Sequence, residues 1–187
     1  MFGGYKNIRW FSYSLVLICS SFLASCGDPV GGKGTSEVFL SVQADDIYGV
    51  SSDVYNSSFA GNVSMDSTDV VVKSVYRDPT DSTQTDFADI LLTEQRVTYY
   101  RSDGNPNVPD PFMITLPNNL VPNGGELNLE IVVVRASAKL KSPLKELAFG
   151  GGEGEIYMSA FVQFYGKDLT GRSAYGEITI PIWFSDY

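Results

Sequence analysis

The stretch ELNLEIVVVR, residues 126–135, alternates apolar and polar side chains more regularly than the rest of the sequence. Asn128 and Glu130 fall on one side of an extended chain, and four apolar residues fall on the other, namely Leu127, Leu129, Ile131 and Val133. Because successive side chains of a β-strand point to opposite faces, this period of two predicts a strand that buries one face. Such a strand needs a second layer of protein to cover its apolar side.

Six further stretches have the length and composition of strands and are separated by turn residues. They are VFLSVQ (38–43), DVVVKSVYR (69–77), ILLTEQRVTYYR (90–101), FMITL (112–116), EIYMSAFVQFYG (155–166) and AYGEITIPIWF (174–184). Pro111 and Pro117 bound the stretch FMITL, which predicts a short strand there. Pro181 cannot donate a hydrogen bond to a neighbouring strand, so its nitrogen is expected to face an open edge or a bulge.

The stretch SPLKEL, residues 142–147, has the features of a helix about two turns long. Ser142 is suited to the N-cap, Pro143 to the first helical position, and the run that starts at Gly150 to the end of the helix. A helix in this place would cross between strands. Strands that greatly outnumber helices indicate two sheets packed face to face.

We therefore predict an all-β domain over residues 37–187, an immunoglobulin-like antiparallel β-sandwich of about seven strands with one short crossover helix. The segment 44–69 lacks clear periodicity and is long for a loop, and we expect a short strand near residues 54–59. Most of the 11 Tyr, 11 Phe and 2 Trp fall in strands and are expected in the core. Tyr48, Tyr55 and Phe59 fall in the unpatterned segment and are candidates for ligand contacts or for loop packing.

The N-terminus has the features of an export signal. Lys6 and Arg9 precede an apolar stretch over residues 15–23, which is about half of the ~20 residues needed to span a bilayer. Small residues follow this stretch, and Cys26 comes directly after them. We therefore interpret residues 1–25 as a cleaved signal peptide rather than as a membrane-spanning helix.

The four residues Leu23, Ala24, Ser25 and Cys26 resemble the lipobox of bacterial lipoproteins. The resemblance implies that the signal peptidase recognises the first three residues and that Cys26 receives a diacylglycerol group. Residues 26–36, which are rich in Gly, would then form a flexible tether. In such proteins an Asp directly after the Cys favours retention in the inner membrane; Gly27 stands here instead, so we expect the outer membrane.

The last third of the chain, from VVVRASAKLKSPLKEL (132–147) to VQFYGKDLTGRSAYGEITI (162–180), is similar to small outer-membrane lipoproteins that have an immunoglobulin-like β-sandwich. This resemblance covers no defined catalytic motif. It implies a membrane association through the lipid on Cys26 and adds no activity that can be assigned to residues of this chain.

The composition excludes several classes of function. The chain has no His, so Ser-His-Asp catalysis and imidazole metal sites are excluded. The region after residue 25 keeps all 22 acidic residues and, without Lys6 and Arg9, 11 of the 13 basic residues. So acidic a chain repels phosphate backbones, and we expect no nucleic-acid partner.

Two groups of acidic residues are candidates for calcium, which prefers six to eight oxygen ligands. The first group is Asp45, Asp46 and Asp53, and the second is Asp78, Asp81 and Asp86. Neither group matches the spacing of an EF-hand loop. Aspartates of solvated turns, which accept hydrogen bonds from their own backbone, explain the same pattern, so we expect no obligatory cofactor.

Three functions are compatible with these observations. The first is a non-catalytic interaction or assembly module at the cell envelope, bound to a protein partner. The second is a glycan- or calcium-binding module that uses loops 44–66 and 78–89. The third is a hydrolase that depends on two carboxylates, which can operate without His. Because no acidic residue stands out by its context, we expect that the protein is not an enzyme.

The substitution Cys26→Ser tests the lipid anchor. Without the thiol no diacylglycerol can be attached, so the variant is expected to leave the membrane fraction for the soluble fraction. Fractionation of cells and immunoblotting of each fraction measure the change. A variant that still sediments with membranes as fully as the parent protein would show that the anchor lies elsewhere.

Overall fold

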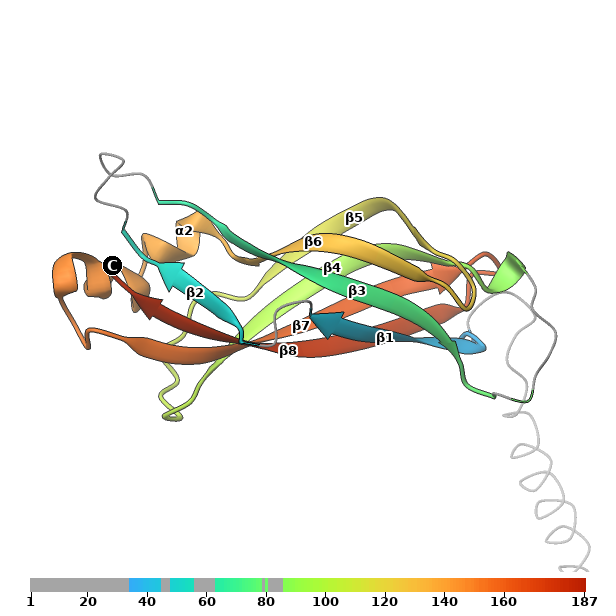
Figure 1. Cartoon of the computed structure of the whole chain (residues 1–187), viewed down its shortest axis with the longest axis horizontal. Helices are drawn as coiled ribbons and strands as arrows, with labels where there is room; N and C mark the ends of the chain where they lie inside the picture. The colour runs from blue at the N-terminus through green and yellow to red at the C-terminus, as the bar shows by residue number, and fades with distance from the viewer. Residues whose placement is uncertain (1–33, 45–47, 56–62, 79, 81–85) are drawn as a thin grey trace, which may run out of the picture. The chain divides into compact units, whose positions relative to one another are not determined.

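The structure is a computed structural model that describes residues 34–44, 48–55, 63–78, 80 and 86–187, and these residues form two packed β-sheets (Figure 1). The smaller sheet has the strand order β1 (Val38–Ala44), β3 (Asp66–Tyr76) and β6 (Glu126–Val134). The larger sheet has the order β2 (Val50–Asp53), β8 (Ser173–Ser185), β7 (Ile156–Asp168), β4 (Ile90–Arg101) and β5 (Phe112–Val121). The all-β sandwich predicted from the sequence is confirmed.

The connections between the strands follow the immunoglobulin-like pattern. The chain passes from β3 in the small sheet to the β4–β5 hairpin in the large sheet, returns to β6, and crosses again to β7 and β8. The strand predicted from residues 126–135 is β6, in which Ile131 and Val133 are buried while Asn128 and Glu130 are exposed. The alternation of this stretch therefore reports the buried face correctly.

The strand β2 is an element that the sequence did not predict. It covers residues 50–53 and raises the described strands to eight, whereas most of the strand expected near residues 54–59 lies outside the described residues. It also pairs with β8 in parallel, so the predicted fully antiparallel arrangement is wrong at this one edge. Pro181 lies one residue before the stretch of β8 that pairs with β2, and its partner in β7 is Ser159, so the expectation that its nitrogen faces an open edge or a bulge stays a prediction.

The strand β5 is longer than predicted because Pro117 does not end it. β5 lies at the edge of its sheet, and its register against β4 shifts between Leu92 and Glu94. Pro117 and the following Asn118, which has a φ of 62°, belong to this irregular part of the strand. A residue without an N–H group is tolerated at such a position, because no neighbouring strand needs its hydrogen bond.

The predicted crossover helix is two short elements. The α-helix α2 (Ala136–Lys139) follows β6 directly, and the 3₁₀ helix η3 (Leu144–Gly150) starts after Pro143. Ser142 makes no capping bond to this helix; its hydroxyl instead accepts a long hydrogen bond from the side chain of Asn107 at 3.4 Å. The location of the crossover was thus predicted correctly and its type was not. A further 3₁₀ turn, η2 (Asp86–Ala88), precedes β4.

Polar side chains connect the two sheets where β6 is irregular. The register of β3 against β6 shifts between Asp66 and Ser67. Close to this shift the amide of Gln95 donates to the carbonyl of Val132 at 2.9 Å, and the hydroxyl of Tyr99 donates to the carbonyl of Val133 at 2.6 Å. Both donors come from β4 in the other sheet, and burial raises the pKa of Tyr99. In a regular sheet these buried carbonyl groups would accept hydrogen bonds from a neighbouring strand. Here they accept them from side chains of the opposite sheet.

A buried Lys connects the crossover to the strands at one end of the sandwich. The Lys139 ammonium, whose side chain is 0% exposed, donates to the Asp66 carboxylate at 2.8 Å and to the carbonyl of Asp53 at 2.7 Å. The other oxygen of Asp66 accepts from the hydroxyl of Ser52 at 2.6 Å. This cluster joins α2 to β2 and β3, so it positions the only parallel strand among those described.

Replacing Lys139 by Met is expected to lower the free energy of unfolding by about 3 kcal/mol, because one partner of a buried ion pair is removed and the other remains. Urea denaturation at neutral pH measures the change. The matched control is Lys141→Met, since Lys141 pairs with Asp110 at the surface and both side chains are well exposed. If the two variants shift the denaturation midpoint equally, the buried pair is not a stabilising element.

Candidate functional site

The residues of the predicted lipid anchor lie outside the described part of the chain. Leu23, Ala24, Ser25 and Cys26 all precede residue 34, so lipidation and export stay predictions. Among the residues that the structure describes, no helix is long and apolar enough to cross a membrane.

The described members of the two calcium groups act as turn residues. The carboxylate of Asp53 accepts from the backbone N–H of Tyr55 at 3.2 Å. The carboxylate of Asp78 accepts from the hydroxyl of Thr80 at 2.6 Å and from its N–H at 2.9 Å, and these bonds lower the pKa of Asp78. Of the other four candidates, Asp45, Asp46 and Asp81 lie outside the described residues. Asp86 begins η2, but its side chain is not among those described.

Asp53 and Asp78, one described member of each calcium group, lie at opposite ends of the sandwich. Asp53 is next to Ser52, which bonds Asp66 at the start of β3, whereas Asp78 follows the end of β3. At about 3.4 Å per residue, the strand between them is on the order of 35 Å long. Within the described residues, no group of three or more acidic, Cys or His side chains could hold a metal ion. Asp53 and Asp78 therefore belong to separate turns.

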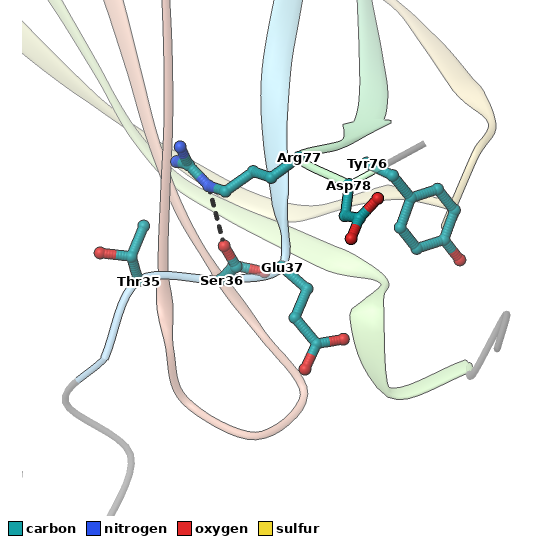
Figure 2. Close-up of a pocket in the computed structure, with 6 residues that line it drawn as sticks. All are labelled: Thr35, Ser36, Glu37, Tyr76, Arg77 and Asp78. Atoms are coloured by element: carbon teal, nitrogen blue, oxygen red, sulfur yellow. Dashed lines mark hydrogen bonds between the residues drawn. The ribbon is translucent and has the colours of Figure 1, made fainter. Parts of the chain in front are cut away.

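A shallow pocket of about 440 Å³ lies where the chain enters the sandwich (Figure 2). Six residues line it, namely Thr35, Ser36, Glu37, Tyr76, Arg77 and Asp78. Arg77 donates from its side chain to the carbonyl of Ser36 at 3.0 Å and from its backbone to the carbonyl of Glu37 at 2.9 Å. These bonds hold the entering chain against the end of β3, which gives this side chain a structural role.

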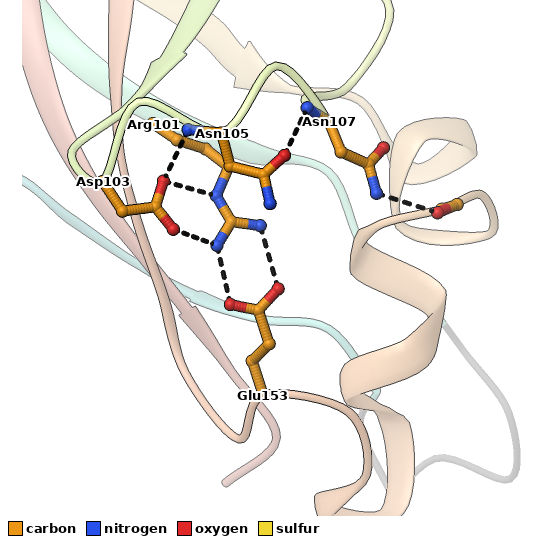
Figure 3. A network of polar contacts seen from close by, with 6 residues as sticks. Arg101, Asp103, Asn105, Asn107 and Glu153 are labelled. Atoms are coloured by element: carbon orange, nitrogen blue, oxygen red, sulfur yellow. Dashed lines mark hydrogen bonds and ion pairs between the residues drawn. The ribbon is translucent and has the colours of Figure 1, made fainter.

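A second polar network surrounds Arg101 at the other end of the sheet (Figure 3). The Arg101 side chain is 3% exposed and donates to Asp103 at 2.6 and 3.0 Å and to Glu153 at 2.7 and 3.1 Å. These hydrogen bonds hold the pKa of both carboxyl groups below their usual range. A pocket of about 280 Å³ opens beside this network, lined in part by Tyr100 and Pro106. Carboxyl groups of low pKa are poor general acids at neutral pH, so this pair fits a structural clamp better than a hydrolase.

The most distinctive surface is the outer side of the five-stranded sheet. Six aromatic residues of β4, β7 and β8 share this side, and we call them the aromatic face: Tyr100, Tyr157, Phe161, Tyr165, Tyr175 and Trp183. Tyr157 pairs directly with Trp183, and Tyr165 pairs directly with Tyr175. Tyr100 and Tyr157 are 62% and 57% exposed, so their rings are available to a partner.

The phase of the alternation explains why these aromatic residues point outward. In β7 the neighbours of Tyr157, which are Ile156 and Met158, are both 2% exposed and lie in the core. The expectation that strand aromatics are core residues is therefore wrong for the aromatic face, although it is right for Phe164 and Phe184. The outward phase of β7 also contains Ser159 and Gln163, and these polar residues are the signal in the sequence that could have identified the solvent side.

The aromatic face is ordered by contacts among its own residues. The rings of Tyr165 and Tyr175 lie 5.3 Å apart, and the guanidinium of Arg96 lies 4.8 Å above the ring of Tyr165. The side chain of Gln163 donates to the Tyr175 hydroxyl at 2.8 Å, and this hydroxyl donates in turn to Glu177. Burial and the bond to Glu177 raise the pKa of Tyr175, so its hydroxyl stays protonated at neutral pH. A surface that is ordered in advance loses less entropy when it binds.

The aromatic residues of the unpatterned segment form no comparable surface among the described residues. The ring of Tyr55 lies 4.5 Å from the ring of Phe149, which indicates loop packing. Tyr48 is 79% exposed, and Phe59 lies outside the described residues.

A scan of the sequence against protein-family models and a search of curated proteins both find no match.

Adjacent substitutions in β7 test the orientation of this strand. Met158→Ser is expected to lower the free energy of unfolding by about 3 kcal/mol or more, because it leaves a cavity and buries a hydroxyl. Tyr157→Ser is expected to leave the denaturation midpoint nearly unchanged, since its ring is exposed. A larger loss for Tyr157→Ser than for Met158→Ser would mean that the two faces of the sheet are assigned the wrong way round.

Proposed function

We propose that the chain is an exported, lipid-anchored binding module of the cell envelope, without catalytic activity, whose aromatic face binds a protein partner. The observation that carries this proposal is the placement of six aromatic side chains on the solvent side of one sheet. Rings on that side lie outside the core, so their cross-strand pairs contribute less to folding than buried rings do. Contact with another molecule is the role that accounts for them.

The composition of the aromatic face favours a protein as the partner. Tyr, Trp, Phe, Met and Arg are the residue types enriched where proteins bind each other. Besides its rings, the outer side of this sheet contains Arg96 and Met113, which pair across β4 and β5, and Met113 is 58% exposed. Tyr rings supply a large contact area with few rotatable bonds, which limits the entropy lost on binding.

The other candidate functions have less support from the described residues. In the loops proposed for glycan or calcium, Asp53 and Asp78 form turn hydrogen bonds. In the Arg101 network the carboxyl groups of Asp103 and Glu153 have lowered pKa values. A glycan could stack on the aromatic face itself, and the experiment below distinguishes that ligand from a protein.

The anchor part of the proposal is supported by the sequence around Cys26. The outer membrane is the proposed location, because Gly27 follows the Cys. A chain held at the membrane surface meets its partner at a raised local concentration, so a face of moderate affinity is sufficient.

A photoreactive phenylalanine analogue placed at residue 157 tests the aromatic face in intact cells. The full lipidated protein is expected to form a discrete adduct with one envelope protein after irradiation, because the ring at this position contacts the partner. The matched control places the analogue at residue 128, since Asn128 is exposed on the outer side of the opposite sheet. The control is expected to form no such adduct.

Three results would contradict the proposal. Equal adducts at both positions would mean that the contact is not specific to the aromatic face. An adduct of twice the mass of the chain would identify a second copy rather than a different protein. Absence of any protein adduct, together with glycan binding that Tyr157→Ser abolishes on a glycan array, would assign the face to a sugar ligand.

A further inference from the structure

Two exposed apolar side chains meet at one end of the sandwich. Phe87 in η2 is 66% exposed, and Leu169 in the turn between β7 and β8 is 56% exposed. The backbone N–H of Leu169 donates to the carbonyl of Phe87 at 3.2 Å, so the two loops lie side by side. We call Phe87 and Leu169 the apolar tip. Two large exposed apolar residues on adjacent loops are not needed for the core.

The chain enters the sandwich at this same end. The N–H of Ser173 donates to the carbonyl of Gly34 at 3.0 Å, and the N–H of Ser36 donates to the carbonyl of Ser173 at 2.9 Å. Ser173 is the first residue of β8 and follows the turn that contains Leu169. Gly34 is therefore fixed next to the loops that carry the apolar tip, as Figure 1 shows for β1, η2 and the β7–β8 turn.

The length of the chain before Gly34 limits how far the entry end of the sandwich can lie from the membrane, and this step rests on the proposed lipidation of Cys26. Eight peptide steps separate Cys26 from Gly34, and they can span at most about 29 Å. The strand β8 extends over 13 residues, or roughly 40 Å, toward the other end. The apolar tip therefore stays within about 29 Å of the lipid surface, whereas the far end is roughly 40 Å further along the sandwich and reaches the surface only when the domain tilts toward the membrane.

Two carboxylates beside the turn, those of Glu37 and Asp168, are bonded within the protein. The carboxylate of Glu37 pairs with Arg172 at 2.7 Å. The carboxylate of Asp168, which is 6% exposed, accepts from the hydroxyl of Thr170 at 2.6 Å and from the N–H groups of Thr170 and Arg172 at 2.9 Å. Burial would raise the pKa of Asp168, but these bonds outweigh it and lower the pKa. The charge of Asp168 is directed into the turn, and the apolar side chain of Leu169 is directed outward.

We propose that the apolar tip inserts into the surface of the membrane in which the Cys26 lipid is anchored. The insertion adds a second attachment to the bilayer, so the sandwich stands on the membrane by this end. In that orientation both outer sheet surfaces, including the aromatic face, remain accessible to a partner.

Labelling with an environment-sensitive fluorophore tests the insertion. Removal of residues 1–25 leaves Cys26 as the sole Cys, and its sulfur is used by the lipid, so an introduced Cys is the one free thiol. Phe87→Cys and Leu169→Cys are made in the full lipidated protein, labelled with a nitrobenzoxadiazole group and reconstituted into vesicles of phosphatidylethanolamine and phosphatidylglycerol. Leu140→Cys is the control, because Leu140 is 61% exposed and follows Lys139, which is bonded at the far end.

The fluorophore at residues 87 and 169 is expected to emit several-fold more strongly in the vesicles and to be quenched by a nitroxide on the lipid acyl chains. The fluorophore at residue 140 is expected to show neither effect. If the protein floats with the vesicles and the labels at 87 and 169 are not quenched, the anchor is correct and the insertion is wrong. Equal quenching at all three positions would also overturn the insertion. If the protein does not float with the vesicles, the proposed anchor fails, and the insertion fails with it.

Discussion

The structure depends on one constraint: each strand of a two-layer sandwich has one face buried in the core and one face exposed to solvent. β7 shows this most clearly, because it lies between β4 and β8 in the five-stranded sheet. Its inward residues, from Ile156 to Phe164, fill the core together with those of β8. Its outward residues then have no protein layer over them among the described elements. Rings at these positions do not fill the core, and the proposed contact with a partner accounts for them.

The second determinant of the structure is the way in which the small sheet is joined to the large one. Apolar packing supplies most of the contact, but it is not directional. The directional contacts lie at the irregular part of β6, where Gln95 and Tyr99 reach its carbonyl groups, and at Lys139, which joins the crossover to β2 and β3. Polar groups that are fully hydrogen-bonded in this way specify one register between two sheets. The far end of the sandwich is thereby held rigid, and the aromatic face keeps a defined shape.

The parts of the fold that the sequence predicts are those with a local signal. From Leu127 to Ile131, β6 has a single apolar phase, and its buried side was correctly predicted from ELNLEIVVVR. In β7 both phases contain large apolar or aromatic residues, and the polar residues Ser159 and Gln163 are the local signal of the solvent side. β2 consists of the four residues VSSD and pairs in parallel with the end of the chain, and no local pattern encodes such a distant contact. Pro117 and Ser142 were misread because edge position and tertiary contacts override local preference.

In the candidate site too, features encoded by adjacent residues can be predicted from the sequence, and features that need contacts between distant segments cannot. Cys26 is predicted as a lipidation site from the sequence alone, because a targeting motif is contiguous, and this stays a prediction. The aromatic face is assembled from β4 and the consecutive strands β7 and β8, so the register of these three strands brings its rings together. The two described calcium candidates, Asp53 and Asp78, accept hydrogen bonds from residues of their own turns.

Hydroxyl-radical footprinting tests the central claim most directly, because it reads the solvent exposure of Tyr and Trp rings in place. The oxidation rates of Tyr100, Tyr157 and Trp183 would be compared between intact cell envelopes and the purified protein, with Tyr187, which is 67% exposed at the C-terminus, as the reference. The account predicts that the three rings are protected in envelopes while the reference is oxidised equally in both samples. Equal oxidation of the three rings in envelopes and in purified protein would contradict it.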